Sequence, residues 1–336
     1  MSRPSPAARP VPAPTRRALL GLAALGGTGA LAACSGGEPE PAPTTPEPAP
    51  TPTETGPAPE PTPTETEEPF VPEGLSESQR SEYRFGDHPR QVSDLWLPAD
   101  GRREAIVVLV HGGGYMARTD RRNLNLHVAD LVGRGWPVLN TDYRGYDDDG
   151  GGWTGTFTDV ATAVDMAAEA AAQHGLPLER TAVVGHSAGG HLALWAAARP
   201  RLPEGAPGSG PRVVPAVAAS MSGVLHPTAL GGETGDPNVV AVFGGPADVV
   251  DQHYALGDPT RLVPLGVPLR VVHGTADDTV PVTQTQEFAD AATAAGDTVS
   301  LQLFEGGTHV DPLYVGEETW GSVRDWITAQ LEALGA

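Results

Sequence analysis

The chain has 336 residues, of which 39% are hydrophobic, and its 42 acidic residues outnumber 21 basic residues, all of them arginine. This length and apolar share are typical of a globular protein with one or two domains, not of a membrane-embedded protein. The acidic excess repels nucleic acid and anionic lipid headgroups, so neither is expected as a direct partner.

Residues 1–34 have the pattern of an export signal that ends at a cysteine. Arg16 and Arg17 precede an apolar, glycine-rich run that is too short for a spanning helix. The run ends in Leu-Ala-Ala-Cys34, which resembles a bacterial lipobox, so Cys34 is the predicted site of lipid attachment. We therefore expect the protein on the extracytoplasmic face of the cell membrane. The arginine pair also allows twin-arginine export, and an ordinary cleavage site with an incidental cysteine is the alternative.

Residues 35–72 consist almost entirely of Pro, Glu, Thr, Ala and Gly. This composition has too little apolar surface to offset the entropy lost on ordering, which predicts a disordered linker. One folded domain is then expected over residues 73–336. That domain contains no cysteine, so neither a disulfide nor a thiolate metal site is available to it.

Short β-rich runs alternate with helical patterns through residues 73–336, as in βαβ units with a largely parallel sheet. The predicted strands are 81–85, 91–97, 105–110, 137–140, 181–184, 214–220, 269–272 and 299–304. The predicted helices are 124–134, 157–174, 189–198, 283–295 and 320–334. Residues 223–263, rich in Gly, Pro and Asp, are predicted to form a short polar lid without an amphipathic helix. Asp159, Asp165 and Glu169 are expected on a solvated helix face, not in a metal site.

Gly185-His186-Ser187-Ala188-Gly189 lies between a predicted strand and a predicted helix, which is the context of a nucleophile elbow. In such an elbow the turn is so sharp that its flanking residues are glycine, and the serine hydroxyl stands above the sheet. The bare G-x-S-x-G pattern is common in glycine-rich chains, so the context carries the prediction. Ser187 is therefore the candidate nucleophile.

A glycine loop, His111-Gly112-Gly113-Gly114-Tyr115, directly follows the predicted strand 105–110. Its glycines let main-chain N–H groups approach a substrate and stabilise a developing oxyanion. Phosphate-binding loops also follow strands, but their G-x-G-x-x-G and G-K-[ST] patterns are missing here. His111 is expected to brace the loop. Tyr115 and His186 are candidates for the substrate pocket. Tyr115 and Trp153 are candidate aromatic walls for an aryl or sugar ester, with packing alone as the alternative for either ring.

An acid and then a histidine are expected past later strands of such a fold. Asp277 follows the seventh predicted strand in the sequence HGTADDTVP, and His309 follows the eighth in a glycine-rich loop. Asp278 is predicted to be an exposed turn residue and His273 to pack at the strand end. The scattered histidines indicate no metal cluster.

On these motifs the domain resembles the esterase and lipase branch of the α/β-hydrolases that includes kynurenine formamidase-like and bacterial feruloyl esterase-like proteins. The resemblance implies an α/β fold of the α/β-hydrolase type, with a mostly parallel central sheet, helices on both faces and a short lid insertion. It also implies the site residues: nucleophile Ser187, acid Asp277, base His309, and oxyanion donors in the main-chain N–H groups of Gly113, Gly114 and Ala188. The sequence Thr308-His309-Val310-Asp311 departs from the Asp-His-Phe-Asp common around the base in this family, so a different local pocket is expected.

The predicted function is a serine hydrolase that cleaves small acyl esters through an acyl-enzyme, without a cofactor or a metal. The alternatives are an amide or formamide hydrolase or a peptidase with the same triad, and a lipoprotein that binds without turnover. The short polar lid favours small acyl esters over long-chain lipids, and the acidic excess favours uncharged or weakly polar esters over polyanions. The expected partners are a small-molecule ester and, through lipid on Cys34, the membrane; the sequence does not determine an oligomeric state.

Overall fold

The computed structural model describes residues 71–232 and 234–336. The predictions for the signal at 1–34, for Cys34 and for nearly all of the linker at 35–72 lie outside the described residues, so they stay predictions. None of the helices formed by residues 71–232 and 234–336 combines the length and the apolar character needed to cross a bilayer.

An eight-stranded sheet runs through the centre of the described domain, in the order β1-β2-β4-β3-β5-β6-β7-β8. Strand β2 is antiparallel to both β1 and β4, and all other neighbours are parallel. The strands are β1 (Arg80–Arg84), β2 (Val92–Trp96), β3 (Ile106–Val110), β4 (Val138–Thr141), β5 (Thr181–His186), β6 (Val217–Met221), β7 (Leu269–Gly274) and β8 (Val299–Phe304). Every predicted strand corresponds to one of these, with ends that differ by a few residues.

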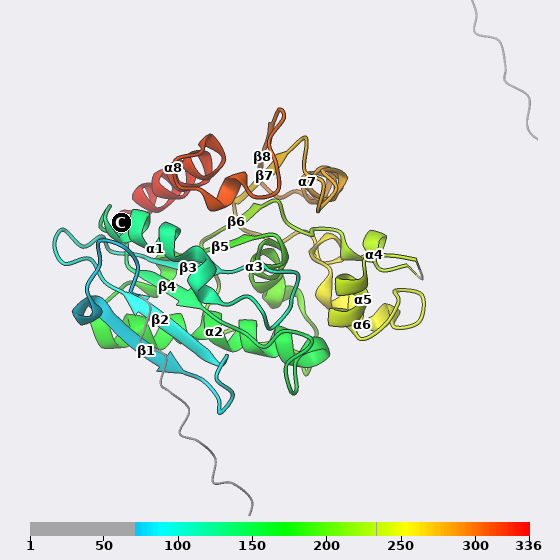
Figure 1. The fold of residues 1–336 in the computed structure, drawn as a ribbon, viewed down its shortest axis with the longest axis horizontal. Helices are drawn as coiled ribbons and strands as arrows, with labels where there is room; N and C mark the ends of the chain where they lie inside the picture. Colours follow the sequence, from blue (N-terminus) through cyan, green and yellow to red (C-terminus); the bar gives the residue numbers. More distant parts are fainter. Residues whose placement is uncertain (1–70, 233) are drawn as a thin grey trace, which may run out of the picture. The chain divides into compact units, whose positions relative to one another are not determined.

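Helices cover both faces of the sheet (Figure 1). Those on one face are α1 (Asn125–Val132) and α8 (Glu318–Ala333), and those on the other are α2 (Gly152–His174), α3 (Ala188–Ala198) and α7 (Thr283–Ala295). Val107 and Leu109 of β3 lie in the apolar cluster with α1 and α8. Val108 and Val110 point to the opposite cluster, because successive side chains of a strand alternate between its faces. The predicted α/β-hydrolase architecture is confirmed.

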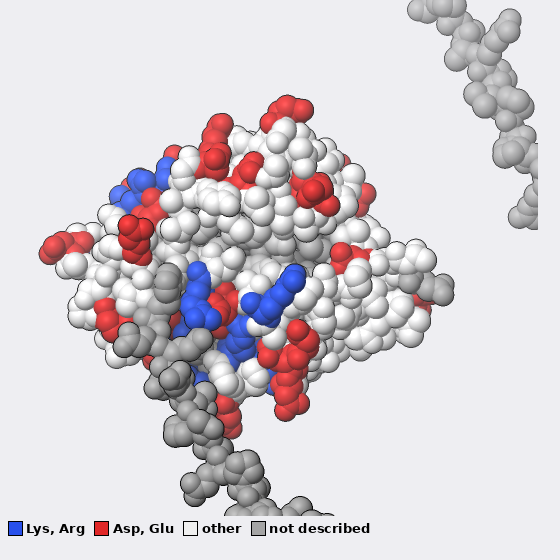
Figure 2. Space-filling model, in the orientation of Figure 1, with Lys and Arg blue, Asp and Glu red and all other residues white. Residues whose placement is uncertain are grey.

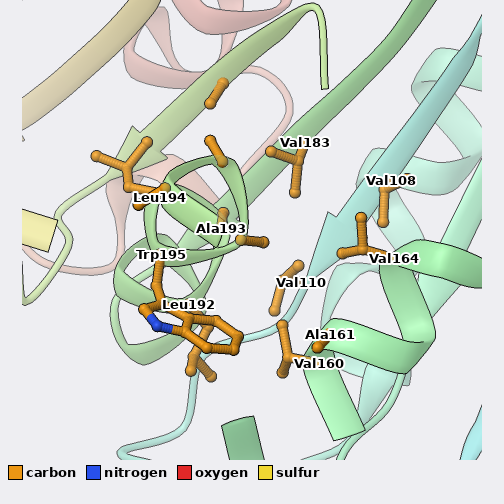
Figure 3. Close-up of a cluster of buried hydrophobic side chains, with 14 of the residues drawn as sticks. Val108, Val110, Val160, Ala161, Val164, Val183, Leu192, Ala193, Leu194 and Trp195 are labelled. Atoms are coloured by element: carbon orange, nitrogen blue, oxygen red, sulfur yellow. The ribbon is translucent and has the colours of Figure 1, made fainter. Parts of the chain in front are cut away.

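Helix α3 is buried on every side, and all of its residues from Ala188 to Ala198 are inaccessible or nearly so. Leu192 and Trp195 are among the α3 side chains that pack with Val110 of β3 and Val164 of α2 (Figure 3). A helix that is apolar all round belongs in a protein core. The turn that enters α3 is therefore fixed by close packing on both sides.

Residues 223–263 differ from the predicted short polar lid in two ways: they form helices that the sequence analysis did not predict, and they have an apolar interior. They contain three short helices: α4 (Pro227–Leu230), α5 (Pro237–Phe243) and α6 (Asp251–Gly257). Phe243 and Tyr254 are buried and stack with ring centroids 4.0 Å apart. Pro237 occupies the first turn of α5 and Gly244 ends it, which are favoured places for these residues. Residues typical of loops thus mark helix ends, and the segment has an apolar interior.

The acidic residues of α2 are ion-paired, so the predicted solvated face is wrong for the inner part of the helix. Asp159 is 2% exposed and pairs with Arg144 at 2.7 Å, and Asp165 pairs with Arg199 at 2.7 Å. These pairs tie α2 to the segments before and after it. Within the described ranges, no group of three or more His, Cys, Asp or Glu side chains is arranged to hold a metal ion.

Candidate active site

Ser187 lies at the sharp turn between β5 and α3, with φ 55° and ψ −123°. A non-glycine residue in this region costs on the order of 1–3 kcal/mol and persists only where its surroundings hold it. A Cβ on Gly185 would lie 2.0 Å from the Gly189 oxygen, and one on Gly189 would lie 2.1 Å from the Val110 oxygen. Both positions require glycine because the main chains of β3, β5 and α3 meet there.

The structure brings Ser187, His309 and Asp277 together from the ends of β5, β8 and β7. His309 Nε2 is 3.0 Å from Ser187 Oγ, and His309 Nδ1 is 2.8 Å from Asp277 Oδ2. A carboxylate only accepts, so Nδ1–H donates to Asp277, which leaves Nε2 to accept the serine hydroxyl. This tautomer is the one that a general base requires.

The Asp277 side chain is buried in a cradle of donors. Its Oδ1 accepts the main-chain N–H groups of Thr279 at 2.9 Å and Val280 at 2.8 Å. Burial alone would raise the pKa of this carboxyl group, but the hydrogen bonds from His273, His309 and the Val280 N–H hold the pKa well below its ordinary value. The carboxylate therefore stays ionised beside the His309 ring.

His273 contributes to this cradle, a role that the sequence analysis missed. Its Nε2 lies 3.0 Å from Asp277 Oδ2, and its Nδ1 lies 2.6 Å from the Thr285 hydroxyl. The sequence placed His273 four residues before Asp277 at the end of β7, which could have indicated a contact. Only the folded turn shows that the two side chains meet. Asp278, one residue further, is exposed, as the sequence predicts for a turn residue.

The glycine loop after β3 is braced by its first residue. The His111 Nε2–H donates to Asp142 Oδ1 at 2.9 Å, and the Tyr143 hydroxyl donates to the His111 main-chain oxygen at 2.8 Å. Arg90 and Arg121 lie 3.1 and 3.3 Å from the Asp142 carboxylate and balance its charge. His111 thus supports the loop through a buried ionic network, in agreement with the sequence analysis.

Gly113, Gly114 and Ala188 line one pocket together with Ser187 and His309. Ala188 is the first residue of α3, so its N–H has no acceptor within the helix. The N–H groups of Gly113 and Gly114 donate to no other group in the part of the chain that the structure describes. Three residues that line the pocket with Ser187 therefore have main-chain donors without an acceptor, and that of Ala188 lies at the positive end of the α3 dipole.

The pocket has a volume of about 290 Å³ and a mixed lining. Its apolar lining residues come from the segments after β6, β7 and β8: Val224, Val239, Val280, Val310 and Leu313. Residues 118–123, between the glycine loop and α1, contribute only polar lining residues: Arg118, Thr119 and Asn123. The pocket can hold an apolar group and a polar group in the same ligand.

His186 lines the pocket as the sequence predicts, but it also supports the base. Its Nε2–H donates to the main-chain oxygen of His309 at 2.8 Å. Burial, with a smaller contribution from the neighbouring His309, lowers the pKa of His186 to about 3. His186 is therefore neutral near pH 7 and does not add a positive charge beside the reacting groups.

Tyr115 borders the pocket, but its side chain is only 1% exposed and does not form an aromatic wall. Its hydroxyl donates to His191 Nδ1 at 2.9 Å, and His191 Nε2–H donates to the Gly257 oxygen at 2.8 Å. Trp153 lies outside the lining and stacks on His253, with ring centroids 4.8 Å apart. Of the two alternatives for these rings, the structure supports packing for Trp153, while Tyr115 borders the pocket with a buried side chain.

Comparison with known proteins places these residues in a family. The BD-FAE family model matches residues 93–206, which include the glycine loop and the elbow. A monoacylglycerol lipase from Mycolicibacterium smegmatis is 31% identical over 267 residues, a match that covers 69% of this chain and 91% of the lipase. The chain belongs to the α/β-hydrolase family of esterases and lipases.

Other similar members of this α/β-hydrolase family come from plants. Isoprenylcysteine alpha-carbonyl methylesterase ICME from Arabidopsis thaliana is 26% identical over 254 residues, which cover 70% of this chain. The match covers 58% of that methylesterase, so the chain spans a little over half of its length. Among solved structures, inhibited esterase B from Lactobacillus rhamnosis has a TM-score of 0.65 at 21% identity, covering 79% of this chain and 89% of that one. This last likeness is one of fold.

The close main-chain approach at the elbow predicts a specific loss of stability. Gly189→Ala in this hydrolase should lower the free energy of unfolding by about 1–3 kcal/mol, because its Cβ meets main-chain oxygens that cannot move aside. Gly316→Ala is the matched control, since nothing lies within 4 Å of that Cβ; its effect should stay within about 0.5 kcal/mol. Urea unfolding measures both, and equal stability of the two variants would contradict the prediction.

Proposed function

We propose that this α/β-hydrolase cleaves small carboxylic esters, with Ser187 as the nucleophile, His309 as the general base and Asp277 as the residue that orients it. The observation that carries the proposal is the chain of hydrogen bonds from Ser187 Oγ to His309 at 3.0 Å and from His309 to Asp277 at 2.8 Å. A nucleophile, a base and an orienting acid in this order are the arrangement of serine hydrolases.

In the first half of the proposed reaction, Ser187 Oγ attacks the acyl carbonyl carbon while His309 Nε2 accepts the hydroxyl proton. The ionised Asp277 stabilises the imidazolium that results. The carbonyl oxygen becomes an oxyanion. We expect the main-chain N–H groups of three lining residues to stabilise it: Gly113, Gly114 and Ala188. His309 then gives its proton to the leaving alcohol, and the acyl group stays on Ser187.

In the second half, a water molecule attacks the acyl-enzyme carbonyl and His309 accepts a proton from that water. The same N–H groups stabilise the second tetrahedral intermediate. His309 returns the proton to Ser187 Oγ as the acyl-oxygen bond breaks, which releases a carboxylic acid and restores the starting site. The neutral His186 holds the main chain of His309 and takes no part in these proton transfers.

The same groups can attack an amide or a formamide, so the preference for esters needs its own support. That support comes from the similar proteins, whose names describe a monoacylglycerol lipase and a methylesterase. An ester also demands less of the site, because an alcohol leaves more readily than an amine. We therefore propose ester hydrolysis over amide hydrolysis for this chain.

The triad assignment predicts a sharp difference between two adjacent residues. Ser187→Ala should lower kcat for p-nitrophenyl butyrate by about six orders of magnitude. Asp277→Asn should lower it by roughly 10⁴-fold, because the amide favours the wrong tautomer of His309. Asp278→Asn should change kcat by less than about twofold, since its side chain is exposed. Circular dichroism controls for folding, and a large loss in Asp278→Asn with little loss in Asp277→Asn would refute the assignment.

The size of the pocket predicts the preferred acyl length. At about 290 Å³ it lies near the lower limit of ligand pockets, which run from roughly 300 to 1,000 Å³, and it must hold both parts of the ester. With a series of p-nitrophenyl esters, kcat/KM should be highest at about two to six acyl carbons, because further methylenes find no apolar lining. A maximum at about twelve or more carbons would contradict this, since each added methylene would then contact apolar surface.

We also propose that Cys34 carries lipid and anchors the exported protein. The lipobox-like sequence supports this proposal, and two acyl chains suffice for stable anchoring when the protein surface supplies no attraction. Cells grown with labelled fatty acid should label the unchanged protein and the Ser187→Ala control, and should not label Cys34→Ser. A Cys34→Ser protein that still incorporates the label would show that the lipid is attached elsewhere.

A further inference from the structure

Arg118 lines the same pocket as Ser187 and His309 and carries a charge that no acid balances. Its side chain is exposed, and it makes no ion pair or hydrogen bond with any residue in 71–232 or 234–336. A guanidinium group is charged at all ordinary pH values and presents five donors in one plane. Arg118 therefore offers a ligand a full positive charge at the pocket.

Within the described part of the chain, Arg118 has no ion pair, whereas the arginines that line a second pocket are all paired with acids. A second pocket, of about 300 Å³, is lined by Arg103, Arg134 and Arg324. Each of the three lies within 3.0 Å of a carboxylate oxygen, at 2.6, 3.0 and 2.8 Å respectively. In Figure 2, basic side chains near the middle of the face also lie among acidic ones. Arg118 differs from Arg103, Arg134 and Arg324 in having no acidic partner among the described residues.

The residues that follow Arg118 extend the same polar surface. Thr119 and Asn123 line the pocket, and their side chains have no hydrogen-bond partner among the described residues. Asp236, an acidic residue of the same lining, accepts the N–H groups of Asn238 and Val239 through its Oδ1 and makes no ion pair with Arg118. The Thr119 hydroxyl and the Asn123 amide can each donate or accept, and the Arg118 guanidinium only donates, so the three side chains can together donate to an anionic ligand group with several acceptor oxygens.

We infer that the substrate is an ester that also bears a carboxylate, and that Arg118 binds this carboxylate while Ser187 attacks the ester. The inference rests on the proposed function and narrows its substrate class to half-esters and similar acidic esters. A carboxylate matches the planar fork of a guanidinium and can accept two of its N–H groups. The remaining, apolar part of such an ester fits the valine and leucine lining.

The local charge acts against the general field of the protein. The formal net charge of −21 disfavours anions at long range, which led the sequence analysis to expect uncharged esters. Salt shortens that long-range field to about 8–10 Å, whereas a bound carboxylate would touch the Arg118 guanidinium directly. Contact with Arg118 should therefore decide selectivity once the substrate is in the pocket.

The test measures a ratio of kcat/KM values for charged and neutral esters of the same shape. For the acyl side, mono-p-nitrophenyl glutarate is compared with the p-nitrophenyl ester of glutaramic acid. For the alcohol side, 4-butanoyloxybenzoate is compared with 4-butanoyloxybenzamide. In one of these pairs Arg118→Gln should lower the charged-to-neutral ratio by about tenfold, the scale of one charge-assisted hydrogen bond at an exposed site. Arg118→Lys should restore part of the ratio, since it keeps the charge without the fork.

Arg201→Gln is the matched control for the loss of one positive charge. Arg201 is exposed, lies outside the pocket lining and has no ion pair or hydrogen bond within the described ranges. Its substitution should change the ratio by less than about twofold. An unchanged ratio in both pairs for Arg118→Gln, or an equal drop in Arg201→Gln, overturns the inference. If the unchanged protein hydrolyses neither of the two neutral esters, the proposed function itself is contradicted.

Discussion

The close approach of three main chains at the β5–α3 turn is the constraint on which the site depends. Gly185 and Gly189 let the main chains of β5, α3 and β3 approach so closely that a Cβ at either position would clash with a main-chain oxygen. Ser187 is held between them at a positive φ, and the buried helix α3 keeps it there. Because the same contact involves the end of β3, it also fixes where the glycine loop begins. Ser187 and the start of the glycine loop are therefore positioned by one packing arrangement.

Around this fixed serine, the protein controls charge by burial and hydrogen bonding. The donors of the Asp277 cradle keep a carboxylate ionised in a buried position, which gives the His309 imidazolium a permanent partner. Burial keeps His186 neutral although it touches the same loop. The buried network of Asp142 with His111 and nearby arginines supports the glycine loop in the same way. Ser187, His309 and the ionised Asp277 thus form one chain of hydrogen bonds with a defined direction of proton transfer.

The outer border of the pocket is built from less regular parts of the chain. Residues 223–263 supply Val224 and Val239 from a segment of short helices, and the loop before α1 supplies Arg118. Residues 223–263 also contact α3, since His191 and Trp195 donate to the main-chain oxygens of Gly257 and Leu256. Under the proposed function, residues at the strand ends catalyse the reaction, and side chains of the outer segments determine which esters bind. Arg118 follows this division, because it lines the pocket and, in the part of the chain that the structure describes, makes no ion pair that would support the fold.

The sequence by itself determined the parts of this protein that depend on local patterns. Apolar runs and their alternation gave all eight strands, and the glycines around Ser187 predicted the elbow, because each signal lies within a few consecutive residues. The tertiary structure decided what depends on distant contacts. Helices of four to seven residues, such as α4 and α5, are too short to show a helical period, so the sequence did not predict the helices of residues 223–263. Whether an ionisable side chain is paired, as Asp159 is, or free, as Arg118 is, depends on neighbours far along the chain that only folding brings close.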